Sequence, residues 1–407
     1  MQKISFLLII LLTMIFFMAS CGEESESDPI DKGLCKNVIC QNEGTCNEGK
    51  CECKDGFKGD NCEINMNDCS EVNPCLNGGT CINGVDFYTC DCVGDYGGSI
   101  CQFYNKNSFI STWKTDNEGL GTDKQVVIST YKNSFGIDYG YNYNVDCNND
   151  GVFEVKNQSE DYICNYEEPG TYTIVISGVF PIIHFNITGD KNYKILSLDQ
   201  WGTQELSGMG VSFDNCVNLV VNAVDTPNLS NVKYLTRAFS NIKSINGDIS
   251  HWNISSVEDL DQMFSGLKSF NQDISLWDTS KVTSMVGVFS DAESFDQDLS
   301  SWNVSNVTNM SSMFSGASSF NQNIGNWDVS NVTNMSFMFS EASSFNQDIS
   351  SWEVGNVSNM MLLFYESESF NQDLSSWNVS EVTLCGNFDS GATSWTLPKP
   401  NFTTCTP

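Results

Sequence analysis

Cysteine is the residue type in this chain whose number and spacing most clearly predict chemistry. The sequence holds 18 cysteines in 407 residues, and most of them fall in two compact sets. These sets are Cys35, Cys40, Cys46, Cys51, Cys53 and Cys62, and then Cys69, Cys75, Cys81, Cys90, Cys92 and Cys101. Segments this short cannot bury a large apolar core, so we expect disulfides to hold them, in an oxidising compartment.

The spacing inside the two sets is typical of one kind of module. Each set ends in C-x-C, eight further residues and a last cysteine, and the last loop of the first set contains Gly56, Phe57 and Gly59. Residues 31–63 and 64–102 therefore resemble two epidermal growth factor-like modules. The resemblance implies pairing of first with third, second with fourth and fifth with sixth cysteine. The implied disulfides are Cys35–Cys46, Cys40–Cys51, Cys53–Cys62, Cys69–Cys81, Cys75–Cys90 and Cys92–Cys101.

The second module also carries oxygen-bearing side chains like those of the calcium-binding variant of the family. Asn65 and Asp68 precede Cys69, and Asn83 lies five residues before Tyr88. With backbone carbonyls, these oxygens would suit calcium, the only cofactor that we expect. Asn65 replaces the Asp common in the family, which should weaken the affinity. The alternative is a plain linker that binds no metal.

A second possible calcium group lies in residues 103–193, which are rich in Tyr, Val, Ile and Gly and predict an all-β domain. Asp146, Asn148 and Asp150 match the first half of a calcium loop, but Asn157 stands where a complete loop has a bidentate Glu. A polar β-turn is the alternative interpretation.

The same region resembles a polycystic-kidney-disease-type β-sandwich. The resemblance rests on D-x-x-x-D-G and then Y-x-x-P-G-T-Y-T between residues 145 and 176. Where that family has an aromatic residue and a His, this chain has Cys147 and Cys164, for which we expect a Cys147–Cys164 disulfide across the sandwich. We expect Cys216 to be free and buried, since the count after Cys21 leaves one cysteine over.

Enzymatic chemistry finds little support. The chain has two histidines, His184 in an apolar strand and His251 at the start of a repeat, and it has no zinc spacing, nucleophile elbow or phosphate loop. We therefore expect no enzyme, although the 51 Asp and Glu residues leave a carboxylate-based glycosidase as an alternative. The formal net charge of −32 argues against a nucleic-acid partner.

The elements that must position all these residues are dominated by a 25-residue repeat. Tryptophan recurs every 25 residues from Trp252 to Trp377, and two phenylalanine series, Phe264 to Phe364 and Phe270 to Phe370, keep the same period. A fixed period of this size predicts a solenoid, in which neighbouring coils bury each other's apolar faces. Equivalent rings should then stack as ladders, with an Asn ladder satisfying a buried bend.

Each coil is predicted to contain a short helix and a short strand. In residues 301–325, apolar residues at helical spacing run from Val307 to Ala317, and Ile324 to Val329 read as an extended segment around Trp327. The expected fold is therefore multidomain, with disulfide-rich modules, a β-sandwich-like domain and an α/β solenoid of leucine-rich-like repeats.

Residues 302–325 and 327–350 carry W-[DN]-V-S-N-V-T-N-M-x-x-M-F-S-x-A-x-S-F-N-Q-[DN]-[IL] almost throughout. This motif resembles the BspA-like leucine-rich-repeat surface proteins of bacteria, which implies a surface interaction role. We place the solenoid at residues 194–384 and a cap, closed by a Cys385–Cys405 disulfide, at residues 385–407.

The N-terminal residues indicate export. An apolar run from Ile4 to Met18 is followed by Ala19, Ser20 and Cys21, which resembles a bacterial lipoprotein signal (residues 1–20) with lipidation at Cys21. An ordinary secretory signal is the alternative. Residues 21–30 are acidic and read as a tether, so we expect a lipid anchor in the outer membrane with the body at the cell surface. A periplasm-facing lipoprotein is the alternative.

These features predict a surface binding protein or adhesin that engages an extracellular protein or glycan. The expected contacts are Phe337, Met361 and Leu362, which vary within a constant frame and predict an exposed apolar patch. Alternatively, these side chains fill space beside the final cap. The rival functions are a structural or self-associating envelope protein and a carbohydrate-active surface protein.

Overall fold

The computed structural model describes residues 38–407 apart from short gaps at 42–43, 48, 54–56, 59, 63, 66–68, 70–72, 84–87, 95, 98–99, 105, 132–138 and 186–191. The lipoprotein signal, Cys21, the acidic tether and Cys35 lie outside these residues. The chain divides into two compact units, Met1–Pro74 with Cys81–Tyr88, and Cys75–Thr80 with Thr89–Pro407.

The disulfide-rich modules consist of short two-stranded sheets. The pairs are β1 (Thr45–Asn47) with β2 (Lys50–Glu52), β3 (Phe57–Lys58) with β4 (Ile64–Asn65), β5 (Thr80–Asn83) with β6 (Tyr88–Asp91), and β7 (Tyr96–Gly97) with β8 (Phe103–Tyr104). The structure joins Cys40 to Cys51, Cys53 to Cys62, Cys69 to Cys81, Cys75 to Cys90 and Cys92 to Cys101, which are pairs implied by the module resemblance. These bonds replace the apolar core that such short segments lack.

A β-sheet domain follows the modules. Its strands are β9 (Phe109–Lys114), β10 (Gln125–Ile128), β11 (Asn142–Asp146), β12 (Val155–Gln158), β13 (Tyr162–Asn165) and β14 (Thr171–Val179). β10 pairs with β13, while the other strands belong to a seven-stranded sheet of order β12-β11-β14-β9-β15-β16-β17. Cys147 and Cys164 form a disulfide that links the end of β11 to β13, and so joins the two sheets.

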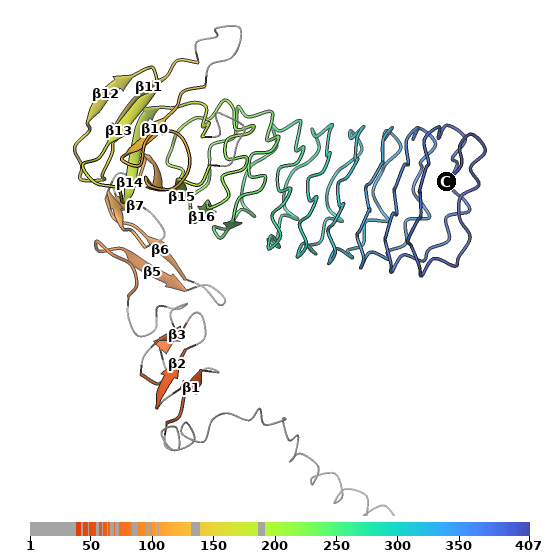
Figure 1. The fold of residues 1–407 in the computed structure, drawn as a ribbon, viewed down its shortest axis with the longest axis horizontal. Coiled ribbons are helices and arrows are strands. Elements are labelled where there is room, and N and C mark those ends of the chain that lie inside the picture. The colour runs from red at the N-terminus through yellow and green to blue at the C-terminus, as the bar shows by residue number, and fades with distance from the viewer. Residues whose placement is uncertain are drawn as a thin grey trace, which may run out of the picture. The chain divides into compact units, whose positions relative to one another are not determined.

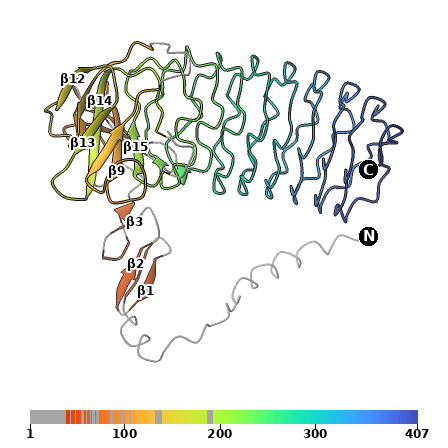
Figure 2. The same cartoon turned by 45° about the horizontal axis from the view of Figure 1, so that its top comes forward.

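The large sheet continues directly into the repeats. β15 (Ile195–Gln200) pairs antiparallel with β9, and β16 (Val220–Val221) and β17 (Ser244–Ile245) add in parallel from the first coils. Figure 2 shows β9, β14 and β15 beside these coils. One buried cluster runs from Phe109 to Trp395, so the β-sheet domain and the solenoid, predicted as separate domains, share a sheet and a core.

Aromatic rings form the spine of the solenoid, whose coils stack in sequence toward the C-terminus (Figure 1). Trp252 and Trp277 stack 6.5 Å apart, and Trp352 and Trp377 stack 6.4 Å apart, with interplanar angles of 10° and 6°. Phe314 and Phe339 stack at 5.7 Å. All of these rings are at most 4% exposed, so the predicted ladders are present and buried.

The predicted helix is wrong, because the described residues of the coils contain no helix. In a helix each N–H would bond four residues back within the coil. Here the N–H groups of Met310, Ser312 and Phe314 donate instead to carbonyls of the next coil, at 2.8–3.0 Å. The alternate N–H groups, those of Met313, Ser315 and Ala317, donate three residues back. The segment is thus a chain of turns that ties each coil to its neighbour.

Left-handed residues explain why helical spacing appeared without a helix. In this segment Ser312 and Gly316 have φ angles of 57° and 70°, and the same two positions are left-handed in the other regular coils. Each such residue redirects the chain after about one turn. The inward positions still recur at intervals of three and four, so Val307, Met310, Met313, Phe314 and Ala317 are all buried as expected.

The predicted strand around Trp327 is also misplaced, since the parallel bridges lie at Asn309, Asn334 and their equivalents. At the Trp edge the backbone N–H groups of Trp302, Trp327 and Trp352 donate three residues back within their own coils, at 3.0–3.1 Å, rather than to the neighbouring coil. Here side chains, rather than backbone groups, connect neighbouring coils. Trp327 Nε1 donates to the Leu299 carbonyl at 3.0 Å, and Asn326 Nδ2 donates to the Ser300 carbonyl at 2.8 Å.

The Asn ladder lies at the surface rather than at a buried bend. Asn321 Oδ1 accepts the backbone N–H of Asn346 at 2.9 Å, and Asn346 Oδ1 accepts that of Asn371 at 2.9 Å. Asn321 and Asn346 are both exposed, so the ladder satisfies backbone groups as expected but at a solvated edge. At the last coil a disulfide joins Cys385 to Cys405, and Phe402 packs on Phe388 at 4.9 Å.

Candidate functional site

The face of the solenoid next to the parallel bridges presents the residues that differ most between coils. Three positions after each bridge residue from Tyr234 onward, every coil has a left-handed residue, and these residues form a column that runs along the solenoid. This column, which we call the left-handed column, consists of Arg237, Gln262, Gly287, Ser312, Phe337, Leu362 and Asn387, with φ between 54° and 59°. Arg237 Nε donates to Gln262 Oε1 at 2.6 Å, which shows that neighbours in the column touch.

Phe337 and Leu362 occupy this column on adjacent coils. The Phe337 N–H donates to the Met361 carbonyl at 2.9 Å, and the Leu362 N–H donates to the Gly386 carbonyl at 3.1 Å. Bulky side chains seldom adopt a left-handed backbone, which costs them about 1–3 kcal/mol. Gly287 holds the same position two coils before Phe337 and three before Leu362, so the fold accepts a residue that avoids this cost.

The structure brings the three predicted contact residues together. Phe337, Met361 and Leu362 are each partly buried on this face, and Leu384, which bridges to Asn359, is 53% exposed beside them. We call Phe337, Met361, Leu362 and Leu384 the apolar patch. Leu384 was not predicted as a contact residue, although it lies 25 residues after Asn359 and replaces a polar residue in the bridge column.

Acidic side chains border the apolar patch. Glu341 and Glu366 hold the second left-handed position of the same two coils, at φ 59° and 51°, and both are exposed. In other coils Gly316 and Gly391 fill this position. The Tyr365 hydroxyl bonds to Glu366, and this hydrogen bond raises the pKa of Tyr365. The patch therefore combines apolar contact area with negative charge.

The predicted calcium ligands are only partly described. Asn65 lies in β4 and Asn83 in β5, while Asp68 falls outside the described residues. The Asp146 carboxylate accepts the backbone N–H groups of Asn148, Asp150 and Gly151 at 2.9–3.3 Å. These bonds form a polar turn, and calcium binding at this turn stays a prediction. In the described part of the chain, no three His, Cys, Asp or Glu side chains gather as a metal site.

The remaining reactive side chains are dispersed. Cys216 is a free, buried thiol, and burial raises its pKa. His184 is largely buried against Tyr131, with ring centroids 5.3 Å apart, and burial lowers its pKa. His251 lies at the surface, 3.4 Å from the Asp248 carboxylate.

Comparisons with known proteins match both halves of the chain. A family described as "Mycoplasma protein of unknown function, DUF285" matches residues 204–313 and 297–398. Two models of epidermal growth factor-like domains match residues 35–62 and 69–99. The matching models name neither the leucine-rich repeat nor the polycystic-kidney-disease domain.

The curated relatives are large animal proteins. The mouse basement membrane-specific heparan sulfate proteoglycan core protein is 38% identical over 86 residues, which are 20% of this chain and 2% of that protein. Protein lin-12 of Caenorhabditis elegans is 44% identical over 62 residues, 14% of this chain and 4% of that protein. Human jagged-1 is 48% identical over 76 residues, which are 17% of this chain and 6% of that protein. The chain thus spans only a few per cent of these relatives.

Disulfide-rich epidermal growth factor-like modules are typical of extracellular and cell-surface proteins. Within the described residues, no helix combines the length and the apolar composition that a membrane crossing requires.

Proposed function

We propose that this chain is a lipid-anchored bacterial surface protein that binds an extracellular protein ligand through the apolar patch of its solenoid. The observation that carries the proposal is that bulky apolar side chains, Phe337 and Leu362, hold the left-handed position on two adjacent coils, where the other coils of the left-handed column have a polar residue or glycine. These two residues keep an unfavourable backbone conformation, although the fold accepts glycine at the same position of another coil. Their side chains therefore indicate a role outside folding.

The chemistry of the face favours one kind of ligand. Apolar side chains at the centre and Glu341 and Glu366 at the border complement a segment with apolar residues flanked by lysine or arginine. The formal net charge of −32 would favour encounter with such a basic segment. Self-association of the chain and carbohydrate processing are the competing functions.

The binding test uses a displayed library of random peptides as the probe. The native protein should enrich peptides that combine apolar and basic residues, and the double variant Phe337→Gly, Leu362→Gly should weaken the selected peptides at least tenfold. Because glycine suits a left-handed backbone, this variant should keep the native fold. Gln262→Gly, in the same column outside the apolar patch, is the matched control and should bind normally.

Two results would count against the proposal. If the native protein and the double variant bound the peptides equally well, the apolar patch would not be the binding site. Concentration-dependent self-association, lost in the double variant and without peptide enrichment, would favour the envelope-structure function. Protease treatment of intact cells tests the surface anchor independently, since an exposed ectodomain should be released from whole cells.

A further inference from the structure

The coil around Glu353 departs from its repeat at one corner. In the neighbouring coils an Asn or Asp side chain accepts the backbone N–H of the serine two residues later, as in Asn303 to Ser305 and Asp328 to Ser330, both at 3.1 Å. In this coil Glu353 and Gly355 hold these two positions. A glutamate is one methylene longer and glycine has no hydroxyl, so the usual turn hydrogen bonds are missing.

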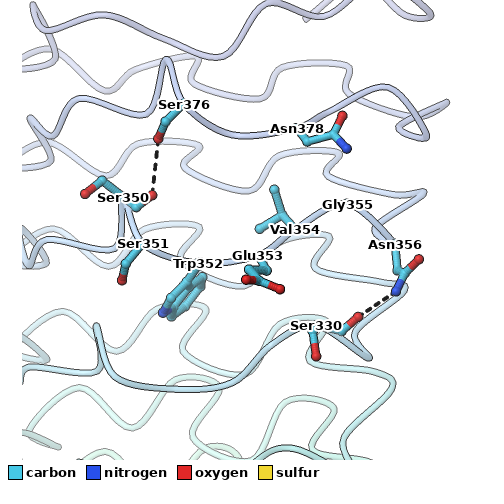
Figure 3. A pocket seen from close by; sticks show the side chains of 10 residues that line it. All are labelled: Ser330, Ser350, Ser351, Trp352, Glu353, Val354, Gly355, Asn356, Ser376 and Asn378. Carbon is cyan, nitrogen blue, oxygen red and sulfur yellow. Dashed lines mark hydrogen bonds between the residues drawn. The ribbon is translucent and has the colours of Figure 1, made fainter.

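A hollow of about 550 Å³ opens at this corner (Figure 3). Residues of three successive coils line it: Ser330, then residues 350–356, then Ser376 and Asn378. A Cβ atom on Gly355 would lie 3.3 Å from Asn378 Nδ2, so the absent serine side chain leaves that amide facing the space. The volume suits one small organic ligand.

The hollow offers both acceptors and donors that the protein itself does not use. Among the described residues, no hydrogen bond or ion pair reaches the Glu353 carboxylate or the Gly355 N–H. The hydroxyl protons around them are already engaged, since Ser376 Oγ donates to the Ser350 carbonyl at 3.2 Å and Ser351 Oγ donates to the Gly325 carbonyl at 2.9 Å. Their oxygen lone pairs therefore remain as further acceptors.

This combination discriminates between ligand classes. A simple cation would satisfy Glu353 but would face the N–H groups of Gly355 and Asn378. An anion would be repelled by Glu353. Neighbouring hydroxyl groups on one ring can donate to the carboxylate and accept from the two N–H groups at once. We propose that the hollow binds a neutral monosaccharide unit, a site separate from the apolar patch.

The experiment measures saturation-transfer NMR on the purified protein with D-glucose, D-galactose, D-mannose and N-acetyl-D-glucosamine as probes. At least one of these sugars should bind with about millimolar affinity. The double variant Glu353→Asn, Gly355→Ser recreates the Asn-Val-Ser corner of residues 303–305 and should fold normally while losing at least tenfold in affinity. Asp278→Asn, in a distant coil, is the matched control and should bind like the native protein.

Methylammonium and N-acetylneuraminic acid serve as charged comparison ligands. The proposal is overturned if none of the four neutral sugars binds, if the double variant binds them as well as the native protein does, or if methylammonium alone binds. The Phe337→Gly, Leu362→Gly variant should still bind the sugar. That result would support the sugar site even if the experiment on peptide binding refuted the apolar patch.

Discussion

Ser311 and Ser312 provide a direct test of the coil structure, because they are adjacent, chemically identical and differ in backbone conformation. Ser312 has φ 57°, whereas Ser311 is not among the left-handed residues. The left-handed conformation costs a non-glycine residue about 1–2 kcal/mol. Glycine avoids that cost but loses about 0.5–1 kcal/mol through greater backbone entropy in the unfolded chain.

The two substitutions should therefore change stability in opposite directions. Ser312→Gly should stabilise the solenoid by about 0.5–1 kcal/mol, and Ser311→Gly should destabilise it by a similar amount. The midpoints of thermal unfolding, followed by tryptophan fluorescence, should then differ from the native value by about 2 °C in opposite senses. In a helix both substitutions would destabilise by about 0.5 kcal/mol. A decrease in both midpoints would therefore refute the chain of turns.

Two further predictions concern the wide edge and the acidic turns. Trp327→Phe should cost about 1–3 kcal/mol, because it removes the indole hydrogen bond to the Leu299 carbonyl, which keeps the Trp302 backbone N–H as its other donor, and because it removes buried volume. Trp201→Phe is the control, since the Trp201 Nε1 has no hydrogen-bond partner among the described residues, and equal unfolding midpoints for the two variants would contradict the role of the indole bond. Hydrogen bonds from Ser350 hold the pKa of Asp348 below its usual value, and Asp273, Asp298 and Asp373 are lowered in the same way by their own serines. This contribution is present above the unfolded pKa and is lost as pH falls through the folded pKa. Changing all four to Asn should therefore lower the unfolding midpoint slightly at pH 7 and reduce its fall below about pH 4. An unchanged acid profile would show that these turns do not contribute to the pH dependence.

The sequence predicted which residues are buried better than it predicted the local backbone. The strict period of Trp302, Trp327 and Trp352 indicated stacked coils, because identical positions in a solenoid must lie side by side. The helix was inferred from the spacing of Met310, Met313 and Phe314. That spacing reports which side chains face inward, and a series of turns broken by left-handed residues produces it too. Gly287 and Gly316 hold the left-handed positions of their coils. These glycines were the sequence signal that distinguishes a chain of turns from a helix.

The candidate site was predicted in part. Phe337, Met361 and Leu362 varied within a constant frame, which selected them. The left-handed backbone of Phe337 and Leu362 was indicated only by Gly287, which holds the same position of an earlier coil. The hollow beside Glu353 arises because a Glu and a Gly replace the usual Asn or Asp and Ser in one coil. The turn hydrogen bonds that these two substitutions remove can be recognised only from the structure of the neighbouring coils, where they are present.

The uninterrupted period of 25 residues gives this protein an adjustable length. Each regular coil bridges to the coil before it and the coil after it at the same backbone positions. Gain or loss of a whole repeat in the gene would therefore change the reach of the protein and leave both ends intact. The sheet formed by β9 and β15 at one end, and the disulfide-closed segment at the other, would serve an array of any number of coils. Lineages that carry this protein can thus vary the distance between its two ends without inventing a new fold.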